Sequence, residues 1–377
     1  MNSKNIAFHI GSANLGGTEN HIIRIASRLQ SSGYNVFLIM DSFEGELLEK
    51  IKKMEVKIFC NRMQKIKILR LVWIIKTYRF LVKNDIEVLN VYNDISIFYF
   101  GIIASLIKNI RMVISIRHNG FGFYSGGVKL KLISMVCRFL SDYIIVNSHN
   151  AKKNLIKYYH IDKNRINVIH NGIDKKLIYP NNDNIQLHEL LNTTLTTINE
   201  NTITIGQISR LHKLKDIDTI IKAAEKLVDE NLIFLIIGDG SEKNRLNALI
   251  KSLNLIDKVI LLGSQTNAIS WIRNFDISLL SSYSEGMPNA ILEYMICNKP
   301  VIASKVGGVP EIINHGETGL LFEPGNVEEL VESILRLIKD NLFMEYLGNN
   351  GRRYLEKHFT LDREFNDHLL IYEKVFT

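Results

Sequence analysis

The feature that most constrains the fold is a series of short runs in which apolar residues are consecutive rather than alternating. Consecutive apolar positions are typical of strands that are buried on both faces of a parallel sheet. The runs fall at residues 6–10, 36–40, 56–59, 88–91, 113–116, 144–146 and 166–169, and then at 203–208, 233–237, 259–262, 277–280, 301–303 and 320–322. Helix-like segments, such as 19–30 and 152–159, lie between them. This alternation predicts an α/β protein with doubly wound parallel sheets.

The length and the spacing of these runs predict two domains. A chain of 377 residues exceeds a comfortable single core. We expect a Rossmann-like domain over residues 1–190, a second one over 191–360, and a C-terminal helix over 361–377 that packs back on the first domain. Residues 175–201, rich in Asn and Thr, would form the linker. Two such domains facing each other would place a ligand cleft at the carboxyl ends of both sheets.

Composition argues against several classes of protein. The N-terminus lacks a secretory pattern, and the most apolar stretch, 66–82, is interrupted by four lysines and arginines, so we expect no spanning helix. The three cysteines have neither metal-ligand nor disulfide-framework spacing, which favours a reduced, cytoplasmic setting without a bound metal.

Positive charge is concentrated in the first half of the chain. Residues 1–190 hold 27 Lys and Arg against 14 acids, whereas the remainder holds 19 against 25. Residues 50–83 alone carry 11 cations and one acid, interleaved with Leu69, Trp73, Ile74 and Phe80. The mixture is typical of a helix in an anionic membrane interface, and residues 121–135 are a second candidate. An ordinary core helix with a solvated basic face is the alternative.

Two strand ends in the first half carry candidate site residues. The first strand runs into Gly16, Gly17 and Glu19, where backbone N–H groups at a helix start can approach an anion. The motif is not a GxGxxG, so it supports dinucleotide binding only weakly, and a plain tight turn is the alternative. The fifth strand ends at Arg117 and His118, which would face the expected cleft.

The second half offers a cationic pair and several glycine turns. Arg210 and Lys215 follow a strand and precede a helix, so they could cradle a diphosphate; two solvated surface charges are the alternative. Further glycine-bearing junctions occur at 236–242, 261–264, 281–295 and 304–311. Together these turns indicate a sheet edge that presents backbone to a polar ligand.

Glu285 and Glu293 bracket the turn that contains Gly286, Pro288 and Asn289. No His or Cys at ligand spacing accompanies them, so a metal pair is disfavoured. A glycosidase acid–nucleophile pair is conceivable from residue type alone. Beside phosphate-binding loops, however, carboxylates are better suited to sugar hydroxyls, and the whole pattern matches a sugar nucleotide.

The chain resembles the retaining glycosyltransferases of the GT-B fold, and family 4 (glycosyl transferases group 1) in particular. The resemblance rests, in order, on GGTE, RHNG, NGID, SRLHKLKD, IIGDGSE, EGMPNAILEYM, KPVIASKVGGVPEII and GETGLLF. It covers most of the chain, from about residue 6 to 325. It departs from the family at Ser209, Asp216 and Asn298, where glycine is commoner.

The resemblance implies a role for each matched position. Arg210 and Lys215 would bind the donor diphosphate, Glu293 the ribose hydroxyls, and Glu285 the transferred sugar. The remaining implied contacts are backbone N–H groups of Gly286, Met287, Pro288 and Asn289 at the sugar, Asp239 and Gly240 near the nucleotide, His118 near donor sugar or acceptor, and Gly16, Gly17 and Glu19 at the diphosphate or acceptor.

The resemblance also implies an activity and partners. The enzyme would transfer a hexose from a UDP-sugar, or GDP-mannose, to a lipid-linked saccharide of a bacterial O-antigen, capsule or exopolysaccharide, with retention and without a metal. The leaving phosphate would deprotonate the acceptor. We expect the protein on the inner face of the cell membrane, and no nucleic acid partner. The alternatives are a sugar-nucleotide epimerase of the same fold and a non-catalytic nucleotide-sugar-binding protein.

Overall fold

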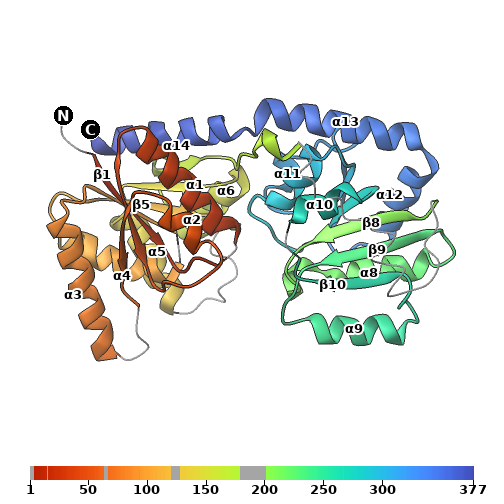
Figure 1. The fold of residues 1–377 in the computed structure, drawn as a ribbon, viewed down its shortest axis with the longest axis horizontal. Coiled ribbons are helices and arrows are strands. Elements are labelled where there is room, and N and C mark those ends of the chain that lie inside the picture. Colours follow the sequence, from red (N-terminus) through yellow and green to blue (C-terminus); the bar gives the residue numbers. More distant parts are fainter. Residues whose placement is uncertain are drawn as a thin grey trace. The chain divides into compact units, whose positions relative to one another are not determined.

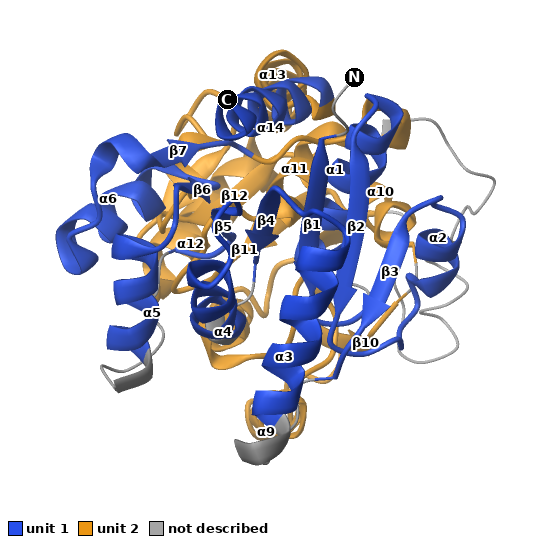
Figure 2. Cartoon of the chain, turned by 90° about the vertical axis from the view of Figure 1, so that its left-hand side faces the viewer, with its two compact units in different colours: residues 1–170, 362–377 blue, residues 171–361 orange. Residues whose placement is uncertain are grey.

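The computed structural model describes residues 4–14, 16–62, 67–92, 94–119, 128–178, 201–265 and 267–377. It divides into two compact units (Figure 2). Unit 1 comprises residues 1–170 and 362–377, and unit 2 comprises residues 171–361. The first division falls about twenty residues before the boundary expected at 190. Most of the expected linker, residues 179–200, lies outside the described residues.

Strands and helices alternate along unit 1 (Figure 1), and its parallel seven-stranded sheet has the order β3-β2-β1-β4-β5-β6-β7 (Figure 2). Its strands are β1 (Asn5–Ile10), β2 (Asn35–Met40), β3 (Lys57–Cys60), β4 (Val88–Val91), β5 (Arg111–Ile116), β6 (Tyr143–Val146) and β7 (Ile166–Val168). All seven predicted strands are present, with their ends within about two residues of the prediction.

Helices cover both faces of this sheet. Its helices are α1 (Gly17–Ser31), α2 (Leu48–Lys52), α3 (Lys67–Lys83), α4 (Asp94–Ser105), α5 (Val128–Phe139), α6 (His149–Tyr159) and α14 (Leu361–Phe376). Helices α3 to α6 share one apolar core with the sheet, and α1, α2 and α14 share the other. Two-sided burial explains why the strands are apolar at consecutive positions.

The last helix of the chain, α14, belongs to unit 1. Its Tyr372 is buried and meets Phe8 of β1 edge to face, with ring centroids 6.0 Å apart. The Asn90 side chain of β4 donates a hydrogen bond to the Tyr372 hydroxyl over 2.6 Å. Helix α14 therefore covers the middle of the sheet, where β1 and β4 are neighbours.

Unit 2 repeats the scheme with a parallel six-stranded sheet in the order β10-β9-β8-β11-β12-β13. Its strands are β8 (Ile203–Ile208), β9 (Leu232–Ile237), β10 (Val259–Gly263), β11 (Ile277–Leu280), β12 (Val301–Ser304) and β13 (Leu320–Phe322). Its α-helices are α8 (Ile217–Lys226), α9 (Lys243–Ser252), α10 (Ala268–Arg273), α11 (Asn289–Ile296), α12 (Val327–Lys339) and α13 (Asn341–His358). Residues of α8, α9 and α12 fill one core and residues of α10 and α11 the other.

Candidate active site

The strand order of unit 2 reverses between β8 and β11, so the chain leaves these neighbouring strands toward opposite sides. Open parallel sheets bind ligands at the carboxyl ends of such a pair. Lys215 follows β8 and Glu285 follows β11. Two predicted residues that lie 70 positions apart in the sequence therefore meet at this switch point.

Lys215 and Glu285 form an ion pair, with 2.5 Å between Lys215 Nζ and Glu285 Oε1. The Ser282 hydroxyl donates to the same carboxylate oxygen over 2.6 Å. Both charged side chains are largely shielded, at 23% and 11% exposure. Glu285 therefore competes with any phosphate oxygens for the Lys215 ammonium.

Backbone contacts fix the two loops that carry this pair. The Ser281 hydroxyl donates to the Lys215 carbonyl over 2.8 Å, and Tyr283 N donates to the Leu214 carbonyl over 2.8 Å. The Ser304 hydroxyl at the end of β12 donates to the Ser282 carbonyl over 2.6 Å. These serines had no predicted role, although Ser281 and Ser282 stand shortly before Glu285 in the sequence.

Arg210 lies in the loop after β8 and is exposed. Among the described residues its guanidinium has no ion pair or hydrogen bond, so its charge is available to a ligand. Gly238 and Gly240 make room for its loop: a Cβ on them would lie 2.0 Å from the Ser209 carbonyl oxygen and 2.2 Å from that of Leu211. These two glycines therefore pack against a neighbouring loop, and the contact of Gly240 with a nucleotide stays a prediction.

Asp239, between those glycines, is already engaged. One carboxylate oxygen accepts from Gly240 N and the other pairs with Lys243, each over 2.7 Å. The Lys243 ammonium lowers the pKa of Asp239. The structure thus gives Asp239 a local role at the start of α9, and its contact with a nucleotide stays a prediction.

Glu293 lies in the second turn of α11, and its environment differs from that of Glu285. Burial raises the pKa of Glu293 to about 7. Within the part of the chain that the structure describes, no hydrogen bond or ion pair reaches its carboxylate. A half-buried carboxylate without donors is a costly arrangement unless a ligand supplies them.

The turn between the two glutamates offers fewer backbone N–H groups to a sugar than the sequence predicted. Pro288 is the N-cap of α11 rather than its first residue, and without an N–H group it cannot donate to a sugar. The Met287 side chain is buried in the core, so only its backbone can face a ligand. Gly308 N donates to the Gly286 carbonyl over 2.8 Å, which ties this turn to the Gly307–Gly308 turn.

In unit 1, Gly16 is the N-cap of α1 and Gly17 its first residue. The Glu19 carboxylate folds back over Gly16, where a Cβ would lie 2.2 Å from Glu19 Oε2. A glutamate at this third helical position commonly covers a helix start. Because a carboxylate repels phosphate, this geometry suits an acceptor hydroxyl at Glu19 better than a diphosphate.

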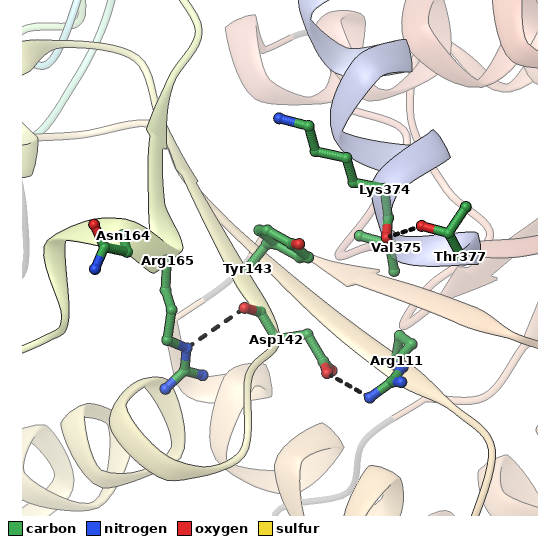
Figure 3. A pocket seen from close by; sticks show the side chains of 8 residues that line it. All are labelled: Arg111, Asp142, Tyr143, Asn164, Arg165, Lys374, Val375 and Thr377. Atoms are coloured by element: carbon green, nitrogen blue, oxygen red, sulfur yellow. Dashed lines mark hydrogen bonds and ion pairs between the residues drawn. The ribbon is translucent and has the colours of Figure 1, made fainter.

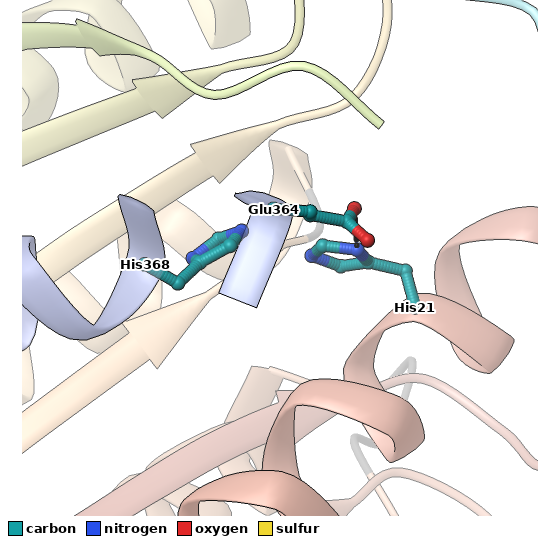
Figure 4. Close-up of side chains that lie close together, drawn as sticks. All are labelled: His21, Glu364 and His368. Atoms are coloured by element: carbon teal, nitrogen blue, oxygen red, sulfur yellow. Dashed lines mark hydrogen bonds and ion pairs between the residues drawn. The ribbon is translucent and has the colours of Figure 1, made fainter. Parts of the chain in front are cut away.

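A charged cluster, defined as His21, Arg24, Arg117, Glu364 and His368, joins elements of unit 1. Its residues His21, Glu364 and His368 are buried and lie close together (Figure 4). Glu364 of α14 bonds His21 Nδ1 over 2.9 Å and Arg24 over 2.5 Å. Arg117, at the end of β5, lies 3.4 Å from His21 Nε2 and 3.9 Å from Glu364. The cluster thus joins α14 to α1 and to the segment that carries His118.

Burial sets the charges in this cluster. Burial, assisted by Arg117, lowers the pKa of His21 to about 4. Burial opposes ionisation of Glu364, but His21, Arg24 and Arg117 outweigh it and lower the pKa of that carboxyl. His21 is therefore neutral and donates its Nδ1 proton to an ionised Glu364. Glu364 could not be recognised as a candidate from the sequence, because its partners lie more than 240 residues away.

His21, Glu364 and His368 place ligand atoms within 4.8 Å of one another, which raises the question of a metal. Arg24 and Arg117 already neutralise Glu364, and a divalent cation among two guanidiniums would be repelled. We interpret the cluster as a buried ion-pair network.

A cavity of about 320 Å³ in unit 1 lies elsewhere (Figure 3). Arg111 and Tyr143 in its lining are the first residues of β5 and β6, and Arg111 pairs with Asp142 over 3.2 Å. The cavity is therefore at the amino ends of the strands, opposite to the edge that carries His118.

Two departures from the glycine pattern have a structural explanation. Asp216 has φ 46° and Asn298 has φ 61°, both in the left-handed region that favours glycine. Asp and Asn are the other residues that tolerate this region. The Asp216 carboxylate also accepts a hydrogen bond from Thr219 over 2.6 Å, which anchors the start of α8.

Comparison with known proteins identifies the family. The family model of Glycosyltransferase Family 4 matches residues 15–177, and that of Glycosyl transferases group 1 matches residues 193–354. The chain belongs to the glycosyl transferases of group 1. The glycosyltransferase is 30% identical over 239 residues to the N-acetyl-alpha-D-glucosaminyl L-malate synthase of Bacillus anthracis, a match that covers 62% of this chain and 60% of the relative.

Two further similarities extend over more of the glycosyltransferase. It is 24% identical over 300 residues to the UDP-Gal:alpha-D-GlcNAc-diphosphoundecaprenol alpha-1,3-galactosyltransferase of Escherichia coli, covering 76% of this chain and 75% of the relative. The solved structure of Anabaena Alr3699/HepE in complex with UDP-glucose has a TM-score of 0.85 at 20% identity, covering 98% of this chain and 99% of that one. The expected GT-B fold and the glycosyltransferase assignment are therefore confirmed.

Proposed function

We propose that this glycosyltransferase moves a hexose from a UDP-sugar to a lipid-linked saccharide in bacterial surface polysaccharide synthesis, with retention at the anomeric carbon. The observation that carries the proposal is the switch point of unit 2. There the exposed Arg210, the shielded Lys215–Glu285 pair and Glu293, which has no ion pair among the described residues, follow one sheet edge. Cations suit a diphosphate, and carboxylates suit the hydroxyls on either side of it.

Each residue has a part in donor binding. Arg210 and Lys215 hold the diphosphate, and Glu293 accepts hydrogen bonds from the ribose hydroxyls. Glu285, released as Lys215 turns to phosphate, accepts a hydroxyl of the transferred hexose. The two cations supply the charge that a metal would otherwise supply, so we propose catalysis without one.

The reaction follows from this arrangement. The bond from the anomeric carbon to the diphosphate oxygen breaks as the acceptor oxygen bonds that carbon on the same face. The acceptor proton passes to the departing phosphate oxygen, whose charge Arg210 and Lys215 stabilise. His118 and the Gly16–Gly17 turn of unit 1 would contact the sugar or acceptor.

The relatives support the choice of donor and acceptor. The E. coli relative is named for UDP-Gal and a diphosphoundecaprenol-linked sugar, and the Anabaena protein was solved with UDP-glucose. The names of the E. coli and B. anthracis relatives both specify an alpha configuration of the transferred sugar. A UDP-sugar donor and a lipid-diphosphate acceptor would suit both the unit 2 site and the basic first half.

We further propose that helix α3 rests on an anionic membrane surface at the inner face of the cell membrane. Its exposed side carries the apolar residues Leu71, Val72, Ile75 and Val82 and the cations Lys76, Arg79 and Lys83. Apolar and cationic residues on one solvent-facing side are typical of interfacial helices. None of the described helices is both long and apolar enough to cross a bilayer.

The structure corrects which α3 residues could serve this contact. Trp73, expected in the interface, is 2% exposed and donates its indole N–H to the Asn61 carbonyl over 2.6 Å. Ile74 and Phe80 pack partly against the core. Leu69 and the aromatic residues of the second candidate, 121–135, lie outside the described side chains.

Turnover tests this function directly. The purified enzyme is incubated with UDP-, GDP- and ADP-sugars and an undecaprenyl-diphosphate saccharide, and the product is analysed by NMR. We expect UDP release, lengthening of the acceptor and an alpha anomeric signal. A product that is an isomerised free sugar nucleotide would favour the epimerase, and binding without any turnover would favour the non-catalytic protein.

A further inference from the structure

The NGID segment, residues 171–174, carries the chain from unit 1 into unit 2, and the proposed mechanism leaves it without a role. Its first residue, Asn171, is only 3% exposed. Asn171 Nδ2 donates to the Met287 carbonyl over 2.9 Å and to Asn289 Oδ1 over 2.7 Å. Asn171 N also approaches the Met287 sulfur at 3.1 Å. Asn171 thus grips both ends of the turn between Gly286 and α11.

The same segment is tied to the returning chain. Ile173 N donates to the Phe359 carbonyl over 2.9 Å, and Ile173 pairs with Thr360 in a parallel bridge. A Cβ on Gly172 would lie 2.4 Å from the Thr360 carbonyl oxygen, so only glycine fits. The chain segments that enter and leave unit 2 are therefore bonded to each other within unit 2. They lie directly beside Asn171, which holds the turn between Gly286 and α11.

One atom of Asn171 shows that stability alone does not explain the residue. Because Nδ2 faces two acceptors, the orientation of the amide is fixed. Asn171 Oδ1 is then buried without a hydrogen-bond partner among the described residues. An unsatisfied buried acceptor destabilises the fold, which offsets much of what the two donated bonds contribute. A side chain whose hydrogen bonds add so little net stability is better explained by a role in positioning the turn than by a role in folding.

We propose that Asn171 is a positioning residue for glycosyl transfer. It holds the Glu285–Asn289 turn in register with Glu293 and links that turn to the paired crossings between the units. The inference rests on the proposed function, because it assumes that this turn contacts the donor sugar. Asn171 itself need not touch the donor.

Kinetics of Asn171→Ala and Asn171→Ser test the proposal. The alanine leaves the Met287 carbonyl and Asn289 Oδ1 without their donor, whereas serine can restore one bond. We expect kcat/KM for the UDP-sugar to fall about tenfold in the alanine variant, and less in the serine variant. The matched control is Asn231→Ala, since Asn231 also donates a side-chain bond, to the Asn201 carbonyl, but at the amino ends of β8 and β9. We expect that control to lower Tm and leave kcat/KM unchanged.

A double-mutant cycle separates positioning from general loss of structure. Because Asn171 acts partly through Asn289, Asn171→Ala combined with Asn289→Ala should lower kcat/KM by less than the product of the two single losses. Additive losses, or an Asn171→Ala enzyme with wild-type kcat/KM, would overturn the inference. Should the alanine variant fail to fold, the serine variant carries the same comparison. If no nucleotide sugar protects the wild-type enzyme against thermal unfolding, that result contradicts the proposed function instead.

Discussion

Glu293 is the residue whose chemistry is most sensitive to pH. Its folded pKa of about 7 lies above that of a free glutamate, so the folded enzyme binds the proton more tightly than the unfolded chain. The free energy of unfolding therefore falls as pH rises from about 4.5 to 7, because Glu293 ionises in the unfolded chain while it stays protonated in the folded enzyme. We predict that Glu293→Gln raises the free energy of unfolding at pH 8 by on the order of 2 kcal/mol and has little effect at pH 5. Urea denaturation of both proteins at pH 5 and pH 8 measures the change in the free energy of unfolding. A change that is the same at both pH values would refute the prediction.

The same titration should appear in donor binding. An ionised Glu293 accepts ribose hydroxyls better than a neutral one, so the donor KM of the wild-type enzyme should fall between pH 6 and 8. In Glu293→Gln the donor KM should be higher and flat across this range.

Glu285 and Glu293 have separate roles in this account. We predict that Glu293→Ala mainly raises the donor KM, whereas Glu285→Ala lowers kcat by about 100-fold, because its contact matters most as the sugar leaves. Steady-state kinetics with a UDP-sugar measures both. Indistinguishable changes in the two variants would contradict the division.

The sequence predicted these residues better than it predicted their partners. Strand ends placed Lys215 and Glu285 at one sheet edge, because carboxyl ends of parallel strands share an edge. It could not show that the two side chains neutralise each other, since that depends on rotamers and on Ser282. Asp216 and Asn298 stood out only as departures from the family's glycine pattern, and the structure shows that both have positive φ.

At the scale of elements, α14 stabilises unit 1 through one buried carboxylate. Glu364→Gln keeps its shape but leaves Arg24 and Arg117 without a counter-charge. We predict a loss of about 3–5 kcal/mol in the free energy of unfolding, measured by urea denaturation. Asp362→Asn is the matched control. Asp362 lies on α14 like Glu364 and pairs with Arg28 of α1, but its side chain is 82% exposed. An equal loss in both variants would refute the role of Glu364.

The bounds of α14 were predictable from its amphipathic pattern, and the thirteen strands from their consecutive apolar residues. The buried polar side of α14 was not predictable. Glu364 and His368 look like solvent-facing residues in the sequence, and only the fold shows that α1 and β5 cover them.

At the scale of the whole molecule, the account predicts attachment to anionic membranes. We expect the enzyme to sediment with phosphatidylglycerol vesicles at low salt and less at high salt. Leu71→Ser combined with Ile75→Ser should reduce sedimentation severalfold. The control, Val228→Ser with Leu342→Ser, removes exposed apolar residues of unit 2 and should have no effect. Equal behaviour of the two double variants would exclude α3 as the contact.

The central claim is that the carboxyl edge of the unit 2 sheet binds a nucleotide-diphosphate sugar. Thermal unfolding of the wild-type enzyme and of Arg210→Ala combined with Glu293→Ala, each with UDP-, GDP- and ADP-sugars, tests it most directly. We predict that a UDP-sugar at 100 times its Kd adds about 2.7 kcal/mol to the stability of the wild type and almost nothing to the variant. Protection of both proteins alike, or of the wild type by none of these sugars, would contradict the account.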